Sequence, residues 1–85
     1  MFDWDEHNIE HLSQHDVEPE EAEEAATDRE RVPFPAHSGR AGVIGRTEDG
    51  RLLVVILERD RRLWRVVTAR DATASERRAY RRYNR

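Results

Sequence analysis

The last part of the chain, RVVTARDATASERRAYRRYNR at residues 65–85, gathers arginine around a few apolar positions, and nine of its residues are charged. All fifteen basic residues of the protein are arginine. The guanidinium group is a planar fork of N–H donors that matches the oxygens of phosphate or carboxylate, and it stays protonated at any working pH. These arginines can therefore bind and neutralise an anion, but they cannot take up a proton.

Charge is strongly segregated along the chain. Residues 1–30 carry twelve Asp or Glu and one Arg, a net charge of −11, whereas residues 31–85 carry fourteen Arg and six Asp or Glu, a net charge of +8. A GC-rich genome can account for arginine in place of lysine, but it does not account for this separation. The acidic part is most simply a solvated face, and the alternatives are partial neutralisation of the arginines or exclusion of nonspecific RNA.

Length and composition limit the class of protein. Eighty-five residues predict a single domain over 1–85, which buries roughly 60–65% of its unfolded surface. The chain has no cysteine, so neither a disulfide framework nor a thiolate metal site is available. No signal peptide or membrane-spanning run is recognisable, and we expect a cytoplasmic protein.

The acidic part predicts two helices. Asp5 is a suitable N-cap for the first, with Trp4 packing on Ile9 as a hydrophobic staple and Leu12 completing the apolar face. The second helix is expected to begin at Pro19 and to run to about Thr27, because proline suits the first helical position.

Strands are predicted from Val32 onward. Pro33 and Pro35 indicate an edge strand, and three apolar stretches between residues 41 and 69 predict an antiparallel meander. The run Leu52–Leu57 is apolar without alternation, which indicates a central strand covered on both faces.

A last helix is expected to cover one face of this sheet. Thr73 and Glu76 have the spacing of a capping box, so the helix begins at Ala74, and its inner face carries Glu76, Tyr80 and Tyr83. Arg70 falls where the third apolar strand ends, and a strand end holds a side chain more firmly than a loop does. The predicted class is α+β, a small antiparallel meander flanked by two N-terminal helices and one C-terminal helix.

The order of elements and several motifs resemble the BrnT family of ribonuclease toxins. The motifs are FDWDEHN, QHDVEPEEAEEA, GRAGVIG, DGRLLVVILERD and RVVTARDATASERRAY. The resemblance implies a RelE-like fold and metal-independent RNA cleavage without a cofactor. It also implies neutralisation by a BrnA-like antitoxin with a ribbon-helix-helix part, in a heterotetramer that reaches operator DNA only through the antitoxin.

Carried over by position, the resemblance places the family's functional residues at His15, Arg40, Arg70, Glu76, Arg77 and Tyr80. Two positions depart from the family pattern. Gln14 replaces a lysine, which removes a possible phosphate contact, and Asp16 replaces a glycine. These departures motivate the alternative hypothesis of an inactive binding module that keeps the partner surface.

RNA cleavage of this kind uses the substrate's own 2′-hydroxyl, so the protein must stabilise charge and transfer protons. We expect Arg70 and Arg40 to converge on the scissile phosphate, and we expect Arg77, Arg65 and Arg46 to bind the substrate. His15, His37, Glu76 and Tyr80 are the candidates for proton transfer.

Each candidate also has a purely structural explanation. Arg70 could pair with an acidic helix, Arg40 could be an ordinary surface residue, Glu76 could serve only the capping box, and Tyr80 could be core.

The histidines of the first helix separate by helical angle. His7 and His11 fall on the exposed side, whereas His15 falls at the edge of the apolar stripe. His7 and His11 have the spacing of a zinc pair, but without a third ligand we predict no metal site.

Overall fold

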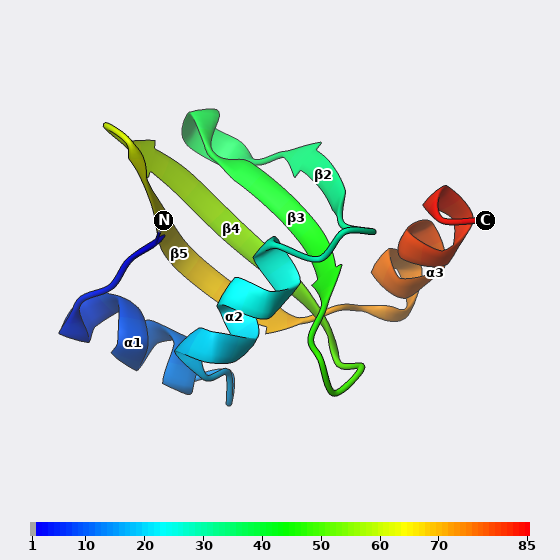
Figure 1. Ribbon diagram of the computed structural model, residues 1–85, viewed down its shortest axis with the longest axis horizontal. Coiled ribbons are helices and arrows are strands. Elements are labelled where there is room, and N and C mark those ends of the chain that lie inside the picture. Colours follow the sequence, from blue (N-terminus) through cyan, green and yellow to red (C-terminus); the bar gives the residue numbers. More distant parts are fainter. Residues whose placement is uncertain (1) are drawn as a thin grey trace.

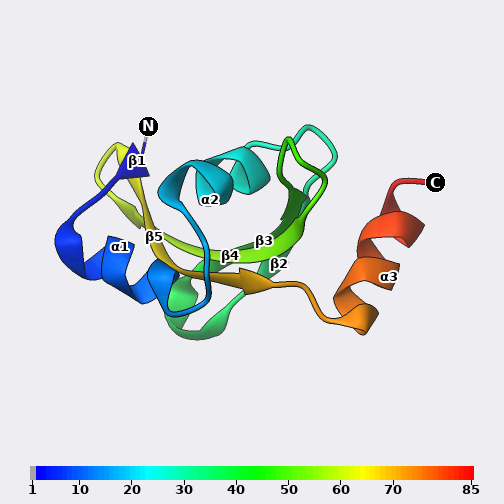
Figure 2. The same cartoon turned by 90° about the horizontal axis from the view of Figure 1, so that it is seen from below.

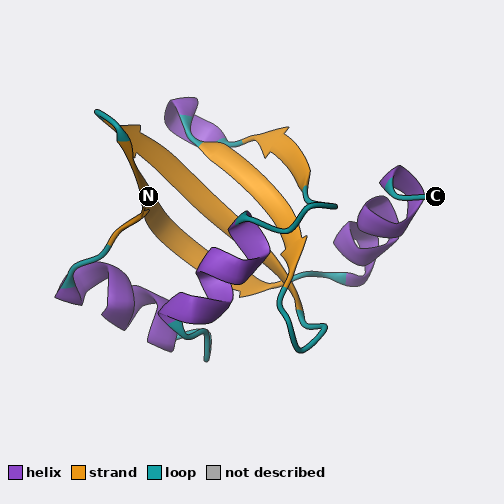
Figure 3. Cartoon of the chain, in the orientation of Figure 1, coloured by secondary structure: helices purple, strands orange, loops and turns teal. Residues whose placement is uncertain are grey.

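Five strands form one sheet with the order β1-β5-β4-β3-β2, and three helices accompany it (Figures 1 and 3). The computed structural model describes residues 2–85. The elements are β1 (Phe2–Asp3), α1 (Glu6–Ser13), α2 (Pro19–Ala26), β2 (Val32–Pro35), the short 3-10 turn η1 (His37–Gly39), β3 (Ala41–Arg46), β4 (Leu52–Asp60), β5 (Leu63–Asp71) and α3 (Ala74–Tyr83). This confirms the α+β class and the predicted order of helices and strands.

Strands β2 to β5 form the predicted antiparallel meander. The sheet as a whole is mixed, because β1 pairs parallel to β5 with Phe2 opposite Trp64. The sequence analysis did not predict this additional strand. Two residues are too few to show the alternation that identifies a strand in a sequence.

Strand β4 lies in the middle of the sheet and is covered on both faces, as its unbroken apolar run predicts. Leu53, Val55 and Leu57 pack on one face with residues of α1 and α2. Val54 lies on the other face with Ile44 of β3 and Tyr80 of α3. Figure 2 shows the sheet nearly edge-on, with α2 above it and α3 beside its far end. The two faces therefore have separate cores.

Helix α1 begins as predicted, because the Asp5 carboxylate accepts a hydrogen bond from the Asn8 backbone N–H at 2.9 Å. The prediction that Ile9 belongs to its buried face is wrong: Ile9 is 42% exposed and Asn8 is 3% exposed. The Asn8 side chain donates to the Val66 carbonyl of β5 at 2.6 Å. A helix that lies against a strand backbone needs a polar group there, because a buried carbonyl without a partner is costly.

Helix α2 begins at Pro19 as predicted and packs very closely on β3. A Cβ atom at Gly45 would lie 1.8 Å from the Ala25 carbonyl oxygen of α2. Only glycine permits this approach of backbone to backbone.

Helix α3 begins at Ala74 with the predicted capping box of Thr73 and Glu76. Tyr80 is buried at 5% exposure, but Tyr83 is 66% exposed, so its assignment to the inner face is wrong. The helix extends beyond the sheet (Figure 1), and the Asn84 side chain at its end donates to the Glu30 carbonyl at 2.8 Å. None of the helices between residues 2 and 85 has the length and apolar character needed to cross a bilayer.

Candidate RNA-binding site at the strand–helix turn

Arg70 and Glu76 meet at the turn between β5 and α3. Arg70 lies opposite Val54 in the register of β4 and β5, on the sheet face that α3 contacts. Its Nη1 donates to Glu76 Oε1 at 2.8 Å and its Nη2 donates to Glu76 Oε2 at 2.9 Å. Nη1 also donates to the Asp71 carbonyl at 3.1 Å. The guanidinium plane is therefore held from two sides.

The carboxylate of Glu76 is itself held by the first turn of α3. Its Oε1 accepts a hydrogen bond from the Thr73 backbone N–H at 2.8 Å. The hydrogen bonds from Arg70 are the main cause that lowers the pKa of Glu76 to about 2, with a contribution from Thr73 and against the effect of burial. Glu76 is therefore ionised at neutral pH, and such a weak base is better suited to orienting Arg70 than to accepting a proton.

The other edge of the Arg70 guanidinium is open. Nη1 uses both hydrogens and Nη2 uses one, while Nε–H and the second Nη2 hydrogen have no acceptor within residues 2–85. These two hydrogens lie along the same edge of the planar group and form a second fork. Such a fork can bind two oxygens of one phosphate.

Arg77 lies beside this turn. Its Nε donates to the Ala72 carbonyl at 3.3 Å, and Ala72 adjoins Asp71, whose carbonyl binds Arg70. The side chain of Asp71 points elsewhere and binds Arg51 at 2.8 Å. Two guanidinium groups are thus attached to neighbouring backbone carbonyls.

Arg40 lies apart from Arg70. It precedes Ala41, which pairs with Leu57 across β3 and β4, whereas Arg70 pairs with Val54 on the other side of β4. Three residues of strand correspond to about 10 Å, and β4 lies between the two positions. Arg40 Nε instead reaches Glu58 at 3.4 Å. The expected convergence of Arg40 and Arg70 on one phosphate is not present.

Tyr80 and Arg46 form a second group on the same face. The Tyr80 hydroxyl donates to Asp28 Oδ2 at 2.6 Å, and the Arg46 guanidinium lies 6.0 Å from the tyrosine ring centre. Burial and the neighbouring Asp28 carboxylate raise the pKa of Tyr80 to about 12. The neutral phenol anchors α3 to the connection between α2 and β2.

The sequence matches the family model described as "Ribonuclease toxin, BrnT, of type II toxin-antitoxin system" over residues 4–76. The chain belongs to this BrnT family. No curated protein matches it. As a type II toxin–antitoxin ribonuclease toxin, it has RNA as its class of substrate and an antitoxin as its class of partner.

In this BrnT protein the family positions Gln14, His15 and Asp16 lie between α1 and α2. Helix α1 ends at Ser13, and Asp16 turns the chain with a φ of 55°, so the helical angle used for His15 no longer applies there. The expected position of His15 at the edge of the apolar stripe is wrong, because the residue is exposed. The backbone carbonyls of His15 and Asp16 accept hydrogen bonds from Arg51, which also binds Asp71 beside Arg70.

Arg65 lies near the start of β5 and serves α1. Its Nη2 donates to Asp5 at 2.6 Å and to the Asn8 side-chain oxygen at 2.9 Å. The structure does not bring it to the Arg70 turn. Among residues 2–85 no group of three His, Asp or Glu side chains is placed to hold a metal ion.

Arg51 is a structural residue of this BrnT chain that the sequence analysis missed. It binds Asp71 at 2.8 Å, Glu21 at 3.2 Å and the backbone carbonyl of Asp16 at 2.8 Å. These contacts join the end of β5 to the α1–α2 turn and to α2. No local sequence signal marks such a residue, because all of its partners lie at least 20 positions away.

Proposed function

We propose that this BrnT protein is a metal-independent endoribonuclease in which Arg70 binds the scissile phosphate. The observation that carries the proposal is the open second fork of Arg70, whose plane is fixed by Glu76 and by the Asp71 carbonyl. A preorganised donor of this kind stabilises the charge that develops on phosphorus, and one such donor is worth on the order of 100- to 1000-fold in rate.

The reaction starts with attack of the ribose 2′-oxygen on the adjacent phosphorus. The P–O5′ bond breaks, the 2′-hydroxyl proton leaves to a base, and a proton reaches the departing 5′-oxygen. The products are a 2′,3′-cyclic phosphate and a 5′-hydroxyl end. Because the nucleophile belongs to the substrate, the protein supplies charge stabilisation and proton transfer.

The predicted site residues take different parts in this proposal. Arg70 and Arg77 flank the same turn and bind the reacting phosphate, and Glu76 is the positioning residue for Arg70. Tyr80 holds α3 in place through Asp28. Arg40 contacts a neighbouring phosphate after leaving Glu58. The substrate-binding roles of Arg46 and Arg65 and the proton-transfer role of His15 stay predictions.

The proposed partner is a BrnA-like antitoxin with a ribbon-helix-helix part. Its heterotetramer with the toxin binds operator DNA through the antitoxin alone, and both act in the cytoplasm. A carboxylate of the antitoxin that occupies the open fork of Arg70 would block the phosphate position directly, without a conformational change in the toxin.

The test is incubation of the purified, antitoxin-free protein with naked RNA in the presence of a chelator. We expect fragments that end in 2′,3′-cyclic phosphate, and no cleavage of DNA of the same sequence, because DNA lacks the 2′-hydroxyl. RNA that stays intact would favour the alternative, a binding module that keeps its partner surface but has no turnover.

Two substitutions sharpen the test. Arg70→Lys keeps the charge but loses the two-pronged geometry, so cleavage should fall on the order of 100-fold. Arg62→Lys is the matched control, because Arg62 is exposed in the β4–β5 hairpin and should leave cleavage unchanged. A wild-type rate for Arg70→Lys would show that positive potential alone is sufficient.

A further inference from the structure

Five arginines lie on the outer side of α3 and just beyond its end: Arg77, Arg78, Arg81, Arg82 and Arg85, all of them exposed. At about 100° per residue the four that belong to the helix fall within an arc of roughly 140°. Tyr80 and Ala79, which pack on the sheet, fall outside this arc. We call these five residues the arginine face.

Within residues 2–85 no residue of the arginine face forms an ion pair with a carboxylate, and the same holds for Arg29, Arg31, Arg59, Arg61 and Arg62, which belong to other elements. By contrast, Arg40, Arg46, Arg51, Arg65 and Arg70 each pair with an Asp or Glu. The chain nevertheless has eighteen acidic residues and a net charge of −3. Apart from the electrostatic effect of Arg77 on Asp71, the positive charge of α3 has no ion-pair partner within residues 2–85 and can meet an external polyanion.

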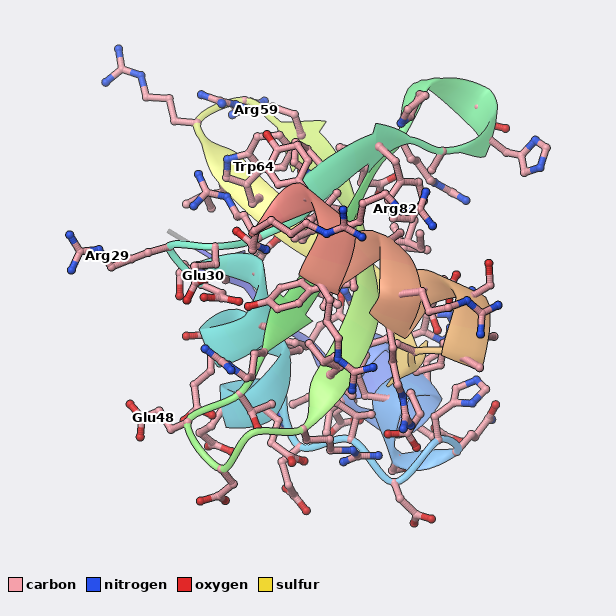
Figure 4. All side chains as sticks on the ribbon, turned by 90° about the vertical axis from the view of Figure 1, so that its right-hand side faces the viewer. Arg29, Glu30, Glu48, Arg59, Trp64 and Arg82 are labelled. Atoms are coloured by element: carbon pink, nitrogen blue, oxygen red, sulfur yellow. The ribbon has the colours of Figure 1, made fainter. Side chains whose placement is uncertain are left out.

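The arginine face is continuous with the Arg70 turn. Arg77 belongs to both, since its Nε contacts the Ala72 carbonyl at the turn. Arg77 and Arg81 then follow one another at an interval of four residues, about 6 Å of helix rise, and Arg85 lies just beyond the helix end. In Figure 4, which faces α3, Arg82 lies on this helix, whereas Arg59 stacks over Trp64 and Arg29 extends away from the helix.

We propose that the arginine face binds the phosphate backbone of the RNA strand on one side of the cleavage point. The inference rests on the proposed function of Arg70 and extends it to a few nucleotides beyond the reacting phosphate. It concerns residues outside the part of the chain that matches the family, which ends at Glu76. The RNA is recognised there by its backbone, without base contacts.

RNA fits this surface better than a protein partner does. Protein interfaces have an apolar or aromatic centre within a polar rim, and the arginine face contains no large apolar side chain. The exposed aromatic residue of α3, Tyr83, falls about 100° outside the arc. A row of charges without an apolar centre suits counterion release from a phosphate backbone.

The experiment measures binding of the full-length protein to a 2′-O-methyl RNA oligonucleotide over a range of salt concentrations. This oligonucleotide cannot be cleaved, so binding is read independently of turnover. The variant is Arg81→Gln with Arg85→Gln, and the matched control is Arg61→Gln with Arg62→Gln in the β4–β5 hairpin, which removes the same charge at another place. Arg81→Lys with Arg85→Lys keeps the charge and controls for folding.

We expect the α3 glutamine variant to bind on the order of tenfold more weakly, and the slope of log K against log salt to decrease in magnitude by about 1.4, because single strands contribute about 0.7 per phosphate contact. The lysine variant and the hairpin variant should keep the wild-type slope. On cleavable RNA the α3 variant should raise KM and leave kcat unchanged.

An unchanged slope in the α3 glutamine variant would overturn the inference. The inference would also be overturned if the α3 glutamine variant no longer bound the antitoxin but bound RNA normally, because the arginine face would then bind an acidic protein. If the protein binds RNA through α3 but cuts no RNA, the proposed function is contradicted, whereas RNA binding by the arginine face is still supported.

Discussion

Arg70 and Glu76 face each other across the β5–α3 turn through two parallel hydrogen bonds of 2.8 and 2.9 Å, and the adjacent Nε–Nη2 edge of the guanidinium has no acceptor within residues 2–85. The same carboxylate caps the first turn of α3. One residue thus sets both where the helix begins and where the arginine points. The strand end, the helix start and the phosphate ligand are parts of one rigid unit.

The first prediction separates these two roles of Glu76. Glu76→Gln keeps the capping box, which accepts Glu or Gln, but it loses the paired charged hydrogen bonds to Arg70. We expect kcat to fall on the order of 10- to 100-fold, because small misplacements of a ligand are costly, while KM changes little and the protein, although less stable, stays folded at the assay temperature. Kinetics with a defined RNA, alongside thermal unfolding, measure both quantities.

Glu58→Gln is the matched control for this prediction. It breaks another arginine–glutamate pair, that of Arg40, and should affect cleavage much less. Equal losses in the two variants would argue against a special role for the Arg70 turn.

The second prediction concerns acid stability. The folded-state pKa of Glu76 is about 2, below its ordinary value of 4.5, so its contribution to stability is complete above pH 4.5 and is lost as the pH falls toward 2. Urea unfolding at a series of pH values should show a difference between wild type and Glu76→Gln that is largest above pH 4.5 and vanishes near pH 2. A difference that grows on acidification would contradict the ion pair.

The third prediction concerns the anchor of α3. Tyr80→Phe removes the hydrogen bond to Asp28 and should cost about 1–2 kcal/mol of unfolding free energy, with little change in cleavage well below the melting point. Because the pKa of Tyr80 is raised from 10.0 to about 12, its stabilising effect is present below pH 10 and lost as the pH rises to about 12. Denaturant unfolding and alkaline titration of the two proteins test this.

The fourth prediction concerns Arg51, which joins the end of β5 to the α1–α2 turn and to α2. Arg51→Met leaves two carboxylates and a carbonyl without their partner. We expect a loss of about 2–3 kcal/mol and a melting temperature lower by roughly 10 °C. Arg78→Met is the control: it is exposed and unpaired within residues 2–85, so its effect should stay within about 0.5 kcal/mol.

Local signals in the sequence were sufficient for the elements themselves. Pro19 starts α2, Thr73 and Glu76 start α3, and the unbroken apolar run of residues 52–57 forms the doubly covered strand β4. These features act within a few residues, through caps, fixed backbone angles and burial of a strand on both faces. They can be recognised without knowledge of the rest of the chain.

Tertiary structure alone decided which charged side chains meet. The strand register separates Arg40 from Arg70, and the turn after β5 brings Arg77 beside Arg70. The buried side of α1 carries the polar residue Asn8 and not the predicted Ile9, because the helix lies against a strand carbonyl. The sequence determined that the arginines cluster near the C-terminus. Which of them are neutralised by carboxylates far away in the chain, and which stay open to a phosphate, depends on long-range packing that no local pattern contains.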